Sequence, residues 1–142
     1  MSDTARCELP SLADLVADRF NGIEKQARSL CELRAGWDFA DAPIIDSDAV
    51  RNAMRLAVLV TCPECLAPVL TPTVHGQVIV DWTWGEERVE VEVSASGALD
   101  VLVRTVDGFE ELSMSLDEPD DLSKLAHLVT GVGIRRFEFK AA

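Results

Sequence analysis

The fold is decided by residues Gly76–Ser115, which read GQVIVDWTWGEERVEVEVSASGALDVLVRTVDGFEELSMS. Within this stretch Val89–Val93 alternates valine with glutamate, a period of two that is typical of a β-strand with one buried and one wet face. Asp107-Gly108 is a strong signal for a two-residue hairpin turn, and strands joined by such short turns pair antiparallel. The stretch therefore predicts an antiparallel meander with strands over residues 77–84, 87–95, 98–106 and 109–116.

Two helices are predicted before this sheet. Apolar residues recur at spacings of three and four over Ser11–Arg34, and Gly36 is placed to end that helix as a C′ glycine. A second helix begins at Asp46 or Ser47 and ends near Thr61. The segment Ala67–Val74 contains two prolines and favours an extended edge strand, so the meander has four to five strands.

A third helix is predicted after the sheet. It begins at Pro119, where acidic residues in the first turn complement the helix dipole, and Gly131 and Gly133 are expected to end it. Ile134, Phe137 and Phe139 then indicate a short final strand or a packed tail. The sequence as a whole predicts one α+β domain over residues 11–142, preceded by a disordered N-terminus over residues 1–10.

The composition is acidic: 25 acidic and 13 basic residues among 142 give a formal net charge of −12. Such a surface repels phosphate backbones and anionic lipids, so we expect no direct binding to nucleic acid or membrane and favour a basic protein partner. An acidic shell that only maintains solubility is the alternative interpretation. The chain lacks an apolar run of membrane-spanning length and a secretory leader at Met1, which predicts a cytoplasmic protein with four free thiols.

One motif has recognised chemistry, the Cys-x-x-Cys of Cys62 and Cys65, with His75 ten residues further on. A structural zinc site needs four ligands, and the fourth is missing here. A redox motif of this type lies at a helix N-terminus, whereas this one follows a predicted helix. We therefore expect incidental thiols, keep a metal or redox site as the alternatives, and expect no cofactor and no catalytic residue.

Three tryptophans bear on binding, since tryptophan is frequent at binding hot spots. Trp82 and Trp84 share the parity of Val78 and Val80, so we expect both to face the helices, with Trp37 packing beside them. Among the three, Trp84 at the strand end is the candidate for exposure and binding.

The other candidate binding residues are carboxylates of the outer sheet face and of the region that follows the sheet. Spaced two residues apart along a strand, carboxylates lie about 6–7 Å apart and can imitate a row of phosphates. The alternative interpretation is that these carboxylates have no role in binding, because the outer face of any strand is polar. The candidates are Glu90, Glu92, Asp100, Asp117, Glu118, Asp120 and Asp121.

Part of the chain resembles a widespread, uncharacterised family of small bacterial and phage-borne proteins. The likeness rests on Gly36-Trp37-Asp38, followed by Ala42-Pro43, a helix, a proline-marked segment in place of P-x-V-x-P, and Gly76–Trp82 in place of G-x-V-x-L-x-W. It covers roughly residues 30–106, with Asp81 where the family pattern has glutamate. The resemblance implies a mobile-element or defence-related setting and the same domain boundaries, and it implies no catalytic residue.

These observations favour a non-catalytic acidic module that binds a basic, nucleic-acid-handling protein, as an antitoxin, immunity factor or inhibitor. A structural protein that self-associates through a sheet edge into a homo-oligomer is the first alternative. A thiol- or zinc-dependent enzyme built on Cys62, Cys65 and His75 is the second.

Overall fold

In the computed structural model the described residues are 12–62 and 67–141, and the described side chains are those of 17–18, 20–62 and 67–131. The N-terminal residues expected to be disordered and Cys65 lie outside these ranges. The elements are, in chain order, α1 (Leu12–Cys31), α2 (Ser47–Val60), β1 (Val69–Pro72), β2 (Val78–Trp84), β3 (Glu87–Val93), β4 (Ala98–Thr105), β5 (Gly108–Ser115) and α3 (Pro119–Ala141).

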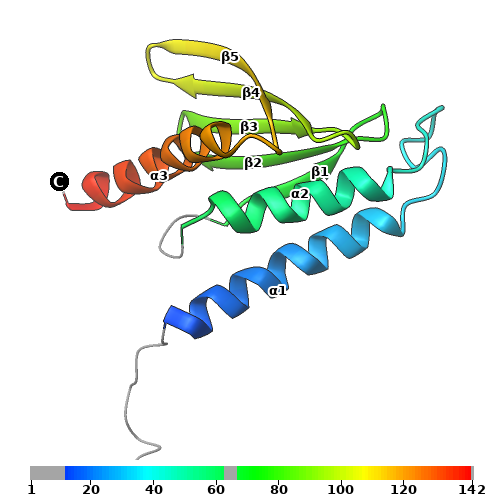
Figure 1. The fold of residues 1–142 in the computed structure, drawn as a ribbon, viewed down its shortest axis with the longest axis horizontal. Helices are drawn as coiled ribbons and strands as arrows, with labels where there is room; N and C mark the ends of the chain where they lie inside the picture. The colour runs from blue at the N-terminus through cyan, green and yellow to red at the C-terminus, as the bar shows by residue number, and fades with distance from the viewer. Residues whose placement is uncertain (1–11, 63–66, 142) are drawn as a thin grey trace, which may run out of the picture.

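The five strands form one antiparallel meander in the order β1-β2-β3-β4-β5, which confirms the predicted α+β fold. The helices α2 and α3 contact β2 and β3, and α1 packs against α2 and β1. Figure 1 shows β4 and β5 on the side of the sheet that lies farthest from α1 and α2. In β3 the valines 89, 91 and 93 are buried, whereas the side chains between them stay partly exposed, so the two faces of the sheet differ as the alternation predicts.

Trp82 occupies the centre of the core and is only 1% exposed. Its indole Nε1–H donates a hydrogen bond of 3.0 Å to the hydroxyl of Thr61, which follows α2. Buried residues from every layer belong to the same hydrophobic cluster, among them Ile23 of α1, Leu56 of α2 and Leu125 of α3. The prediction that Trp82 faces the helices is confirmed. Trp37, expected beside it, packs against the same hydrophobic cluster, and its indole N–H donates a 3.3 Å hydrogen bond to the carbonyl of Pro43.

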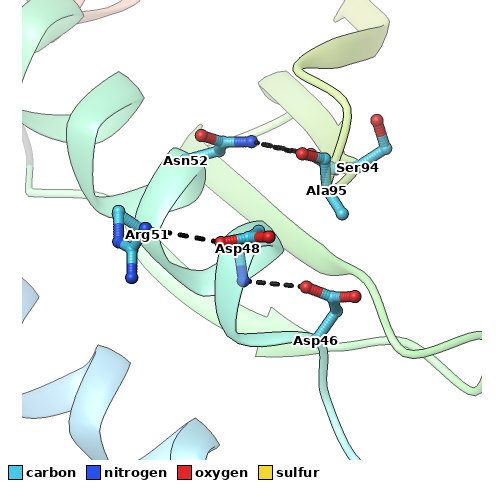
Figure 2. A network of polar contacts seen from close by, with 6 residues as sticks. All are labelled: Asp46, Asp48, Arg51, Asn52, Ser94 and Ala95. Carbon is cyan, nitrogen blue, oxygen red and sulfur yellow. Dashed lines mark hydrogen bonds and ion pairs between the residues drawn. The ribbon is translucent and has the colours of Figure 1, made fainter.

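The N-terminal half of α2 is held by polar contacts, as Figure 2 shows. Asp46 is the N-cap, because its side chain accepts a 2.8 Å hydrogen bond from the N–H of Asp48. One turn further on, Asn52 donates hydrogen bonds of 3.1 Å to the carbonyls of both Ser94 and Ala95 in the β3–β4 turn. A single side chain thus ties α2 to a turn more than 40 residues away in the chain.

We expect Asn52→Ala to lower the free energy of unfolding by about 1–2 kcal/mol, because two turn carbonyls lose their donor. The measurement is urea denaturation followed by circular dichroism. Arg51→Ala is the control: Arg51 is exposed, and its one ion pair among the described residues is the 3.4 Å contact with Asp48, so its loss should change stability by less than about 0.5 kcal/mol. Equal effects of the two substitutions would contradict the role given to Asn52.

Two expectations about helix ends are wrong. The helix α1 ends at Cys31, and Gly36 instead lies in the following loop, where it has a φ of +77° and donates a 2.7 Å hydrogen bond to the carbonyl of Ala42. The helix α3 continues to Ala141, so Gly131 and Gly133 do not end it and no strand forms over residues 134–139. A glycine weakens a helix by about 1 kcal/mol relative to alanine, but it keeps its backbone N–H and can continue the helix.

Candidate binding surface

The face of the sheet turned away from the helices carries the outward side chains of β2 to β5, and we call it the open sheet face. The strand registers place these side chains in rows across the sheet. One row contains Ile79, Glu92, Asp100 and Ser113. The next row contains Asp81, Glu90, Leu102 and Glu111. A third row, beside the hairpin turns, contains Thr83, Arg88, Arg104 and Phe109.

The first two rows enclose a hollow of about 470 Å³, which we call the acidic depression. It extends over four strands, from β2 to β5. Apolar contact is offered by the half-buried side chains of Ile79 and Leu102. Carboxylates surround this apolar part. The lining residues are Ile79, Glu90, Glu92, Asp100, Val101, Leu102, Glu111, Leu112 and Ser113.

The four carboxylates of the depression make no direct contact with a cationic side chain in the described part of the chain. No ion pair or side-chain hydrogen bond among the described residues involves Glu90, Glu92, Asp100 or Glu111. Glu92 and Asp100 are directly opposite each other on β3 and β4, where Cβ atoms lie about 4.5–5.5 Å apart. Like charges in that arrangement destabilise a sheet, so a bound cationic group would relieve an existing repulsion.

The cations of the open sheet face lie at its other end. Arg88 donates from Nε to a carboxylate oxygen of Asp81 at 2.9 Å and from Nη2 to the same oxygen. The hydrogen bond with Asp81, together with the negative charges of Asp81 and Glu90, raises the pKa of the Arg88 guanidinium, although burial acts in the opposite direction. Asp81 thus holds Arg88 in an ion pair, and the charge of Glu90 also acts on this guanidinium, whereas no ion pair among the described residues involves Glu92, Asp100 or Glu111.

The structure brings together three of the predicted binding residues, Glu90, Glu92 and Asp100. Sequence reasoning missed Glu111, which β5 places on the same face. The signal was present, because the two-residue turn before Gly108 sets the register and parity of β5.

The other predicted residues lie elsewhere. Trp84 is half-buried on the helix side of the sheet, where it packs against the core. Asp117 and Glu118 precede α3, and Asp120 and Asp121 are in its first turn. Within this group Asp121 accepts a 2.9 Å hydrogen bond from the N–H of Ser115 at the end of β5. None of these residues lines the acidic depression.

The cysteine motif differs from the expectation of free thiols. Cys62 is half-buried and disulfide-bonded, whereas Cys31 is free and exposed as expected. The overall cysteine count argues against a disulfide framework, but it does not exclude one local bridge. His75 is exposed in the β1–β2 turn. Among the described side chains, no group of three or more His, Cys, Asp or Glu residues is arranged to hold a metal ion.

The function of this protein has to be inferred from its fold and from the acidic depression. No protein family, no curated protein and no solved structure matches the chain. Among the described residues, none of the helices combines the length and the apolar character needed to cross a membrane.

Proposed function

We propose that this protein is a non-catalytic binding module whose acidic depression engages a basic protein. The observation that carries the proposal is the directly opposed pair Glu92 and Asp100, which has no counterion among the described residues. Lysine or arginine side chains of a partner would supply the missing charge. Opposite charges across the interface would also speed association and select against acidic partners.

The apolar part of the depression supports a protein partner rather than a free cation. Ile79 and Leu102 are half-buried side chains between the carboxylates, and interfaces combine an apolar centre with a polar rim. A basic side chain with an aliphatic stem, such as lysine or arginine, fits both parts, because its stem packs on apolar surface while its charge reaches a carboxylate. The role we propose is that of an antitoxin, immunity factor or inhibitor, with a nucleic-acid-handling protein as the target.

The test is capture with the tagged protein from a nuclease-treated lysate of the source cells, followed by elution with a salt gradient. We expect a stoichiometric basic protein that is released progressively as salt rises, because the Debye length falls from about 10 Å at 0.1 M to about 3 Å at 1 M. Nuclease treatment removes proteins that are held only through nucleic acid. A partner that is not basic, or a complex that is insensitive to salt, would contradict the proposal.

A further inference from the structure

The two edge strands of the sheet, β1 and β5, differ in what lies beside their outward backbone groups. At the β1 edge, Gln26 of α1 acts as a neighbouring strand would: its Nε2 donates to the carbonyl of Pro68 at 3.2 Å, and its Oε1 accepts from the N–H of Leu70 at 2.8 Å. This edge is therefore closed by a side chain. At the other edge, β5 is the last strand of the sheet, and Figure 1 shows no described strand or helix running along the side of β5 that faces away from β4.

The direction of the β5 backbone groups follows from its turn. Thr105 and Gly108 flank a two-residue hairpin loop, and such a closing pair exchanges both of its hydrogen bonds across the ladder. Because hydrogen-bonded pairs alternate, the N–H and C=O groups of Phe109, Glu111 and Ser113 point away from β4. Ser115 has the same parity, and its N–H donates a hydrogen bond to the carboxylate of Asp121, which lies outside the β4–β5 ladder.

We propose that β5 accepts an extended, basic segment of the partner as a sixth strand of the sheet. This inference rests on the proposed function and specifies how the partner is bound. The outward N–H and C=O groups of Phe109, Glu111 and Ser113 would supply the main-chain hydrogen bonds of β-strand addition. The side chains of Glu111 and Ser113 line the acidic depression, so the added strand lies directly beside it.

Charge specifies the chemistry of the added strand. Glu110 and Glu111 are both exposed, and successive residues of a strand point to opposite faces of the sheet. Side chains of the added strand would lie about 4.5–5.5 Å from those of β5, so lysine or arginine is favoured on either face. Phe109, which is 70% exposed, offers an apolar contact at the turn end of the same edge.

The same charges argue against a second copy of this chain as the occupant. Antiparallel pairing of two β5 strands about their centre would bring the Glu110 and Glu111 side chains of both copies close together, and like charges across strands are destabilising. β5 has neither proline nor lysine, which commonly protect sheet edges from pairing with another chain. Repulsion between the carboxylates of two copies is therefore what disfavours pairing of one β5 with another. A strand with basic side chains would not be repelled by these carboxylates.

The probe is an eight-residue peptide of alternating lysine and valine with blocked ends, titrated against the full chain at low salt. A second peptide with the same side chains carries N-methyl groups on alternate backbone nitrogens, which removes its donors on one edge. We expect the methylated peptide to bind about tenfold more weakly when the methylated edge faces β5. We also expect amide exchange at Phe109, Glu111 and Ser113 to slow at least about tenfold when the unmodified peptide binds.

The matched variants are Ser113→Pro and Ser113→Ala. Proline removes an outward N–H and leaves the ladder with β4 intact, whereas alanine keeps the N–H and changes only the side chain. We expect the proline variant to bind the peptide about tenfold more weakly than the alanine variant does, because both lack the serine hydroxyl and only the proline variant lacks the outward N–H. If Ser113→Pro does not fold, the methylated peptide and the amide exchange on the unaltered protein decide the matter.

Failure of this inference is distinguishable from failure of the proposed function. If both peptides bind equally and the three amides show no added protection, the edge is not used. The same conclusion follows if the peptide does not bind at all, or if the edge amides become protected with rising protein concentration alone. Salt-sensitive capture of a basic partner would then still support the proposed function, whereas absence of that capture would overturn both.

Discussion

Replacing Trp82 by alanine should lower the free energy of unfolding by about 3–5 kcal/mol, the usual cost of truncating a large buried aromatic side chain. Trp82 is 1% exposed and packs within the single cluster that joins the helices to the sheet. Domains of this kind have total stabilities of about 5–15 kcal/mol, so the variant should be marginally folded at best. The measurement is urea denaturation followed by circular dichroism at 222 nm, with roughly constant slope if the change is one of stability.

Thr61→Val separates packing from hydrogen bonding in this prediction. It keeps the volume near Trp82 but removes the acceptor of the 3.0 Å bond from the indole N–H. We expect a loss of about 1–3 kcal/mol, the cost of a buried donor without a partner, and thus less than for Trp82→Ala. A Trp82→Ala variant that loses under about 1 kcal/mol would show that the core does not depend on this residue.

The double charge reversal Glu90→Lys with Glu92→Lys should abolish capture of the basic partner in the conditions used for the unaltered protein. Each reversal replaces an attraction of up to about 1 kcal/mol by a repulsion of similar size. A combined loss of up to about 4 kcal/mol corresponds to a Kd weakened up to roughly 900-fold at low salt. The measurement is isothermal titration calorimetry with the captured partner at two salt concentrations, and the difference between the proteins should shrink at the higher one.

The matched control is the double reversal Glu32→Lys with Asp41→Lys. Glu32 and Asp41 are exposed and lie away from the sheet, and the change in net charge is the same. We expect this control to bind nearly as the unaltered protein does. The Glu90→Lys, Glu92→Lys variant should also be no less stable, because it relieves the repulsion between Glu92 and Asp100. Equal weakening by both double reversals would mean that net charge, and not the depression, determines binding.

The sheet could be predicted from the sequence because its information is local. The alternation in Val89–Val93 specifies a strand within a few residues, and β3 lies where that signal places it. The predicted two-residue turn also forms, but it consists of Val106 and Asp107 rather than Asp107 and Gly108, so β5 begins at Gly108. The end of α3 could not be predicted in this way. Glycine's propensity is a preference of about 1 kcal/mol, which is too small to determine where a helix ends.

The candidate site was only partly predictable. Parity along β3 and β4 placed Glu90, Glu92 and Asp100 on the outer face, and the structure agrees. The carboxylates near Asp117 and Asp120 were also predicted to be binding residues, although they lie at the start of α3 and outside the depression. The number of carboxylates after the last hairpin turn does not show which of them lie on the open sheet face.

The sequence by itself determined the α+β class, an antiparallel meander of four to five strands and the acidic character of the outer face, because periodicity, turn chemistry and charge act over short stretches of chain. Only the tertiary structure decided which carboxylates meet in one depression, and that Asn52 and Gln26 tie distant segments to the sheet. It also decided that Gln26 covers the β1 edge, whereas no further described strand pairs with β5 beyond β4. These features depend on contacts between residues far apart in the chain, and strand register and helix packing, rather than local preference, bring such residues together.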